Sequence, residues 1–150
     1  MSYEEKNITV SLTSYILIMG FYLVNFFQMY RAEGLNPGRI FALWVTVILA
    51  TILVNILASI LTNILLSIVQ AIRSRTDKVE RFIADERDKL IGLKGNRIAY
   101  IAFSVGVFIA MLTFALGQPP LIMFSLIILF SLLAEIIENC MQLVYYRRGV

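Results

Sequence analysis

The sequence predicts an all-α membrane protein with four transmembrane helices, arranged as two helical hairpins in one domain. Three observations support this prediction. The chain of 150 residues is 59% hydrophobic and only 15% charged, whereas soluble domains are roughly half apolar and a quarter charged. Its apolar residues gather into long uncharged runs, and a helix needs about 20 such residues to cross a bilayer. The runs are separated by glycine and proline or by many charges, which are typical of turns and loops.

The first span is expected at residues 8–30 and the second at residues 40–62. Pro37 and two glycines lie between them and should stop the first helix. The second uncharged run continues to Ile72, and its full length as a helix would be about 50 Å, against a hydrocarbon core of about 30 Å. We therefore expect its last three turns to leave the membrane as a helical extension to residue 72.

The third and fourth spans are expected at residues 98–116 and 121–145. The short segment between them, Gly117-Gln118-Pro119-Pro120, carries no charge. Because neither proline can continue a helix, this segment predicts a tight turn.

Residues 73–97 form the only long charged segment between spans. Within it, residues 76–93 predict an amphipathic cytoplasmic helix, because Val79, Ile83 and Leu90 recur on one face. The charges around this face are nearly balanced, whereas a helix lying on lipid is usually one-sidedly basic. These three apolar residues are therefore the candidate face for contact with another protein.

The distribution of basic residues predicts the orientation. Eleven of the 13 lysines and arginines lie in the N-terminal segment, in residues 73–97 or at the C-terminus, and only Arg31 and Arg39 lie on the other side. Lysine and arginine gather on the cytoplasmic side of a membrane. Both termini are therefore expected in the cytoplasm, in the plasma (inner) membrane, and basic residues beside apolar runs favour contact with lipid headgroups over nucleic acid.

Two carboxylates, Glu135 and Glu138, lie within the fourth apolar run. With 1.5 Å per residue, Glu135 would lie roughly 21 Å and Glu138 roughly 26 Å below the start of this span at Leu121. A carboxylate at the centre of a membrane helix costs about 2.5–3.5 kcal/mol, and such residues usually face the bundle interior. A spacing of three places both carboxylates on one helix face.

The same depth calculation brings Asn55, Ser14 and Ser104 to about the level of Glu135. We therefore expect a polar layer in the inner half of the bundle, in which Glu135 faces Asn55 and the two serines flank them. A simpler interpretation is that the serines and Asn55 serve helix packing, and that Glu138 is an interfacial ion-pair partner of Arg97 or Arg73.

Other kinds of site find little support. The chain has no histidine and one cysteine, Cys140, so the usual zinc, haem and protease sites lack their ligands or bases. The three acidic residues between Asp85 and Asp88 are neutralised by the nearby Arg81, Arg87 and Lys89, which favours an ion-paired solvated face over a calcium or magnesium site. No cofactor, metal site or catalytic set is expected.

Residues 85–91 (DERDKLI), followed by residues 95–100 (GNRIAY) and an apolar helix, resemble a family of small prokaryotic multi-pass membrane proteins classed as a domain of unknown function. The resemblance covers about the second half of the chain. It implies a bacterial or archaeal plasma-membrane protein and implies no activity.

Three functions compete. The first is a non-enzymatic interaction or regulatory protein that forms a homo-oligomer or docks on a larger membrane protein through the 76–93 helix. The second is a small oligomeric proton- or cation-linked transporter that uses Glu135. The third, ranked last, is an intramembrane enzyme acting on a lipid, with Glu135 and Glu138 as acid and base.

Overall fold

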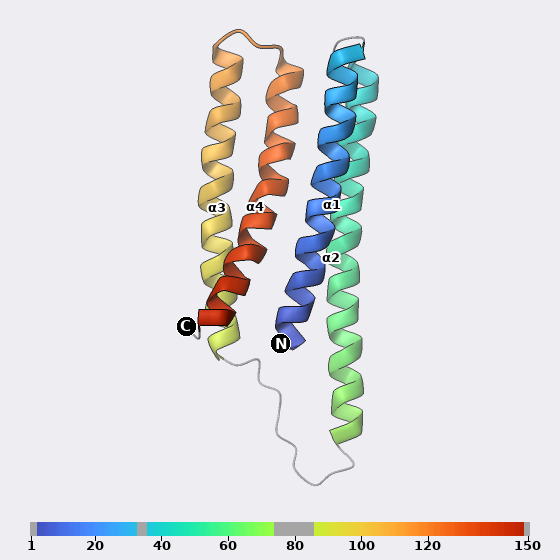
Figure 1. Ribbon diagram of the computed structural model, residues 1–150, viewed down its shortest axis with the longest axis vertical. Helices are drawn as coiled ribbons and strands as arrows, with labels where there is room; N and C mark the ends of the chain where they lie inside the picture. Colours follow the sequence, from blue (N-terminus) through green and yellow to red (C-terminus); the bar gives the residue numbers. More distant parts are fainter. Residues whose placement is uncertain (1–2, 33–35, 74–85, 149–150) are drawn as a thin grey trace.

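The computed structural model describes residues 3–32, 36–73 and 86–148, and this part of the chain contains four α-helices. Their bounds are α1 Tyr3–Ala32, α2 Pro37–Arg73, α3 Glu86–Ala115 and α4 Pro120–Arg148. Successive helices run in alternating directions, so both termini lie at the same end of the molecule (Figure 1).

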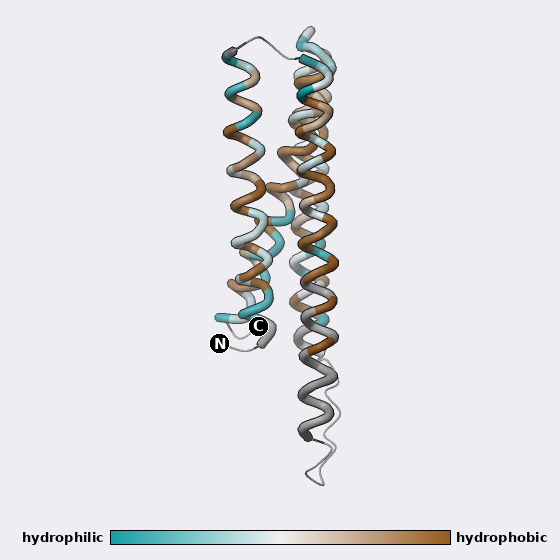
Figure 2. Tube along the Cα trace, turned by 90° about the vertical axis from the view of Figure 1, so that its right-hand side faces the viewer, coloured by the Kyte–Doolittle hydropathy of each residue, from teal (hydrophilic) through white to brown (hydrophobic). Residues whose placement is uncertain are grey.

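Each of the four helices is long and apolar enough to cross a membrane. The qualifying stretches are Glu5–Arg31, Pro37–Leu57, Lys89–Ala115 and Pro120–Arg148. Apolar residues dominate the middle of the helices, while hydrophilic residues gather near their ends (Figure 2). Large apolar side chains such as Leu17, Leu53 and Phe108 are exposed, which suits contact with lipid chains better than contact with water. The prediction of an all-helical chain with four membrane-spanning helices is confirmed at this level, and it indicates a multi-pass membrane protein.

All four helices are longer than the expected spans, and α2 includes the expected helical extension to residue 72. α2 is one continuous helix of 37 residues, or about 55 Å. α3 begins at Glu86, twelve residues before the expected start of the third span, and therefore contains Leu90. An acidic residue in the first turn is favoured by the helix dipole, and single glycines such as Gly92 and Gly95 cost only about 1 kcal/mol each within a helix. Val79 and Ile83 of the expected amphipathic helix lie outside the described residues.

The helix ends have local causes in the sequence. The Asn36 side-chain oxygen accepts hydrogen bonds from the amides of Gly38 (3.0 Å) and Arg39 (3.4 Å), which caps the start of α2. Pro37 occupies the first helical position, where a missing N–H costs nothing. At the end of α3, Gly117 adopts φ +87°, and the Gln118 amide donates to the Thr113 carbonyl at 3.1 Å. This is the glycine-terminated motif that satisfies the last carbonyls of a helix.

α4 is the helix around which the others pack. It contacts α3 along most of its length and also packs against α1, while α2 packs mainly against α1. Within the described part of the chain, the backbone of α3 approaches closely only that of α4. The helices therefore follow one another in space as α3, α4, α1 and α2 (Figure 1).

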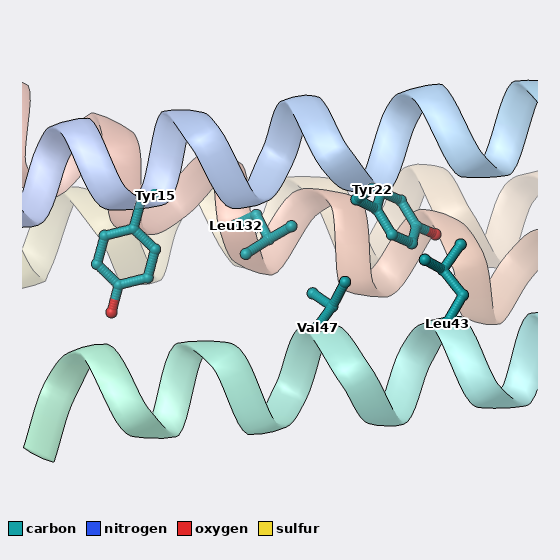
Figure 3. Close-up of a cluster of buried hydrophobic side chains, with 5 residues drawn as sticks. All are labelled: Tyr15, Tyr22, Leu43, Val47 and Leu132. Carbon is teal, nitrogen blue, oxygen red and sulfur yellow. The ribbon is translucent and has the colours of Figure 1, made fainter.

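The core lies between α1, α2 and α4. Its buried residues are Tyr15, Tyr22, Leu43, Val47 and Leu132 (Figure 3). The two tyrosines are seven residues apart, which is two helical turns, so both point from one face of α1 into the core. Their large side chains supply much of the buried apolar area.

The polar atoms of this core are paired across helices. The Tyr22 hydroxyl donates to the carbonyl of Ser125 at 2.7 Å. The indole nitrogen of Trp44 donates to the Ser125 hydroxyl at 3.3 Å. One serine of α4 thereby holds α1 and α2, in an environment where unsatisfied polar groups are costly.

Small residues bring α3 and α4 close together. The buried face of α3 carries Gly95, Ala99, Gly106 and Ala110. A Cβ atom at Gly106 would collide with the ring of Phe130. Small residues spaced by four are typical of close packing between membrane helices.

Candidate functional site

Two carboxylates of α4 form the centre of the candidate site. Glu135 and Glu138 are both half-buried and lie on one face of the helix because their spacing of three is close to one turn. The Gln142 side-chain amide donates to a carboxylate oxygen of Glu138 at 3.0 Å. The buried Asn139 side chain donates instead to the Glu135 backbone carbonyl at 2.7 Å. Glu138 is therefore oriented by its own helix.

The position of Gln142 is in turn set by α3. A Cβ atom at Gly95 would lie 2.7 Å from Cγ of Gln142, closer than real contacts allow. Only glycine at this position lets the Gln142 side chain lie against α3 and reach Glu138. The close contact between α3 and α4 thus extends to the carboxylate site.

Both carboxylates line a hollow of about 420 Å³, here called the bundle hollow, to which all four helices contribute. Its volume falls within the range of about 300–1,000 Å³ that is usual for small-molecule sites. The lining residues are Asn7, Ile8, Ser11, Tyr15, Asn55, Lys89, Ile91, Gly92, Glu135, Glu138, Asn139, Gln142 and Tyr146. Most of them are polar, although the helices around them are long enough and apolar enough to span a membrane.

Tyr15 and Asn55 form the wall opposite α4. The Tyr15 hydroxyl donates to the Asn55 side-chain oxygen at 2.7 Å, and the ring points from α1 toward α2 (Figure 3). Tyr15 is only 2% exposed, and its hydroxyl is close enough to interact with the carboxylate of Glu135. The tyrosine thus links a residue of α2 to the carboxylate of α4.

The structure brings together three of the five candidate polar residues, which are the four of the expected layer and Glu138. Glu135, Glu138 and Asn55 all line the bundle hollow. Ser14 and Ser104 do not line it, and their hydroxyls donate to carbonyls of their own helices, those of Val10 (3.0 Å) and Tyr100 (2.8 Å). Depth along a helix places a residue at a level but leaves its direction around the axis open, since each residue turns by about 100°.

Sequence reasoning missed the polar stripe of α1. Asn7, Ser11 and Tyr15 are spaced by four and all line the bundle hollow. This spacing places them on one helix face, so the repeat itself was a signal that could have found them. Tyr146 at the end of α4 also lines the hollow.

The donor set of the bundle hollow suits cations better than anions. It offers two carboxylates and several amide and hydroxyl oxygens, with Lys89 as the one basic residue among the lining residues. Among the described residues, no group of three or more histidine, cysteine, aspartate or glutamate side chains could hold a metal ion. A proton, a monovalent ion or an organic cation can be accommodated by two carboxylates, whereas divalent ions usually require more oxygen ligands.

The expected protein-interaction face is described only in part. Leu90 lies near the start of α3 and is 56% exposed, while Val79 and Ile83 lie outside the described residues. Leu93, three residues further along, is also exposed.

Comparisons of this chain with models of protein families, with curated proteins and with solved structures give no match.

Proposed function

We propose that this protein binds a cation in exchange for a proton at Glu135 and Glu138, and that this exchange serves transport across the membrane. The observation that carries the proposal is the convergence of both carboxylates on a hollow of about 420 Å³ among four helices that are long and apolar enough to span a membrane. A charged carboxylate within a membrane-spanning helix costs free energy. A proton or cation that neutralises it therefore stabilises the protein.

The surroundings of the carboxylates support binding over simple packing. Gln142 orients Glu138, and Tyr15 is positioned by Asn55 beside Glu135. Polar groups fixed in advance do not have to reorganise when a ligand arrives. A packing role alone would not require open volume next to both carboxylates.

The proposed topology is two helical hairpins with both termini in the cytoplasm. The bundle hollow then lies in the cytoplasmic half, because Asn7 near one terminus and Tyr146 near the other both line it. Four helices enclose little space, so transport further requires an oligomer or a change in helix packing. The inner membrane of a prokaryotic cell is the proposed location.

Flux measurements on the full chain in liposomes test this proposal. A pH-sensitive dye trapped inside should report proton movement when a gradient of Na⁺, K⁺ or an organic cation is imposed. Glu135→Gln keeps the shape of the side chain and removes its charge, so we expect the flux to fall by about tenfold or more. Glu5→Gln, a carboxylate of α1 outside the bundle hollow, is the matched control and should retain the flux. Wild-type protein that moves no more protons than protein-free liposomes under any of these gradients would refute the proposal.

A second candidate function is association with another protein at the start of α3. Leu90 and Leu93 are 56% and 66% exposed, beside the basic residues Lys89 and Lys94. For Leu90→Asp we expect the mass measured in detergent by light scattering to drop from oligomer to monomer, because a charge cannot be buried in an apolar contact. Leu90→Met should leave the mass unchanged. A wild-type monomer would argue against self-association through this face.

A further inference from the structure

Glu135 and Glu138 also line a second hollow, which lies between α3 and α4 and continues along the same side of α4 toward the Gly117 turn. This α3–α4 hollow has a volume of about 270 Å³ and is formed by these two helices alone. Its lining residues are Asn96, Ala99, Tyr100, Phe103, Ser131, Ala134, Glu135 and Glu138. The two carboxylates thus line both hollows.

The two hollows differ in chemistry. The bundle hollow is lined mostly by polar residues and includes Lys89. The α3–α4 hollow is lined by two aromatic rings and two alanines, and none of its lining residues is basic. A positive charge entering it meets aromatic faces, which attract cations, and then the carboxylates, and no described residue on its walls is basic.

The α3–α4 hollow reaches the surface that would face lipid. Tyr100 is 67% exposed, and on the same helix Ile101 and Phe108 are exposed at 58% and 62%. Because the helix around it suits a membrane span, a molecule dissolved in the bilayer can approach the hollow sideways. Asn96 and Tyr100, one turn apart on α3, lie at its exposed edge.

We infer that the ligand is an organic cation with apolar substituents, which enters from the bilayer through the α3–α4 hollow and is neutralised by Glu135 and Glu138. This inference rests on the proposed function, since it assigns a ligand class to the same carboxylates. The apolar substituents contact Ala99, Phe103 and Ala134, and the charge lies at the carboxylates. The bundle hollow gives the same carboxylates access to water and protons.

The charged and titratable groups that face the carboxylates come from three helices. They are Tyr15 of α1, Lys89 and Tyr100 of α3, and Tyr146 of α4. From α2, the lining residue is the uncharged Asn55. Binding of the cation should therefore weaken as protons occupy the two carboxylates at low pH.

Equilibrium dialysis of tetraphenylphosphonium against the purified full chain in detergent tests the inference. We expect saturable binding that Glu135→Gln weakens by about tenfold or more, which corresponds to about 1.4 kcal/mol. Ser131→Leu should weaken binding by a similar factor, because it fills the α3–α4 hollow. The Ser131 hydroxyl donates only to a carbonyl of its own helix, that of Ile128, so leucine should be tolerated. Asn96→Trp, at the exposed edge, is a second blocking variant that does not alter buried packing.

Thr46→Leu on α2 is the matched control. Its hydroxyl also donates to a carbonyl of its own helix, that of Ala42, and it lines neither of the two hollows. It should bind tetraphenylphosphonium as the wild type does. Thermal unfolding of each variant checks that the fold is retained.

Four results would overturn the inference. If Glu135→Gln binds as strongly as the wild type, tetraphenylphosphonium is partitioning into detergent or onto the protein surface. Unchanged binding in both Ser131→Leu and Asn96→Trp would mean that the ligand does not use the α3–α4 hollow. No binding of tetraphenylphosphonium, together with Glu135-dependent flux of Na⁺ or K⁺, would reject the ligand class and leave the proposed function standing. The absence of both binding and flux would reject the inference and the proposed function together.

Discussion

At the scale of single residues, Tyr15 connects the core to the candidate site. Its ring is buried beside Leu132 in the hydrophobic cluster, and its hydroxyl lies at the wall of the bundle hollow. The bond to Asn55 joins α1 to α2 at 2.7 Å. Because the hydroxyl also lies beside Glu135, one side chain couples helix packing to the carboxylate.

Tyr15→Phe should separate these two roles. Phenylalanine keeps the ring in the cluster and removes the donor to Asn55, so we expect the free energy of unfolding in detergent to fall by about 0.5–1.5 kcal/mol. Thermal or denaturant unfolding measures this change. Tyr30→Phe, an exposed tyrosine of the same helix, is the control and should change stability little. Equal stability of the two variants would show that the bond between Tyr15 and Asn55 contributes nothing.

At this scale the sequence predicted which residues share a level along the helices, but not the direction of each residue around its helix axis. Glu135 and Asn55 were expected together because each lies at a similar distance along its helix, and both line the bundle hollow. Ser14 satisfied the same condition but precedes Tyr15 by one residue, so it points about 100° away from it. The direction around a helix follows from packing against neighbours, which a single sequence does not contain.

At the scale of helices, the contact between α3 and α4 depends on glycine. Gly95 and Gly106 both face α4, and a Cβ atom at either would collide with a side chain, Gln142 or Phe130 respectively. Glycine lowers helix propensity by about 1 kcal/mol relative to alanine. That cost is offset here by the close approach of the two helices.

Gly106→Ala should therefore destabilise the protein, although alanine is the better helix former. Overpacking typically costs about 1–3 kcal/mol, and Phe130 has to move to admit the methyl group. Gly92→Ala is a control on the same helix, since nothing lies within 4 Å of a Cβ atom there, and it should leave stability unchanged or raise it slightly. Unfolding of both variants in detergent measures the difference. Equal stability of Gly106→Ala and Gly92→Ala would show that α3 and α4 can move apart at Gly106 without loss of stability.

The sequence predicted the existence of the four helices but not all of their ends. The turn at Gly117 was expected from glycine and two prolines, and α3 does end there. The start of α3 was expected at residue 98 because the charges stop at Arg97. Charge marks where a helix leaves lipid, whereas the backbone stays helical for as long as its hydrogen bonds are satisfied, so α3 begins at Glu86.

At the scale of the whole molecule, both chain termini and the candidate site share one end. The N-terminal residues of α1 and the C-terminal residues of α4 lie together (Figure 1), and the turn between α3 and α4 lies at the opposite end. Eleven of the 13 basic residues lie near the two termini or in residues 73–97, which include the last residue of α2 and the first turns of α3. Such an excess predicts the cytoplasmic side.

Cysteine labelling in intact cells tests this orientation. Cys140 is the single cysteine, so in the Cys140→Ala variant an introduced cysteine is the only thiol that a maleimide can label. Lys6 and Gln118 are both exposed and lie at opposite ends of the molecule. We expect a membrane-impermeant maleimide to label Gln118→Cys in intact cells and Lys6→Cys only after the cells are permeabilised, because the charge asymmetry predicts that the basic end lies in the cytoplasm. The reverse pattern would place the carboxylates in the outer half of the membrane, where the bundle hollow would take protons from outside. Labelling of both positions in intact cells would mean that the chain inserts in two orientations, and the bundle hollow would then face both sides of the membrane in different copies.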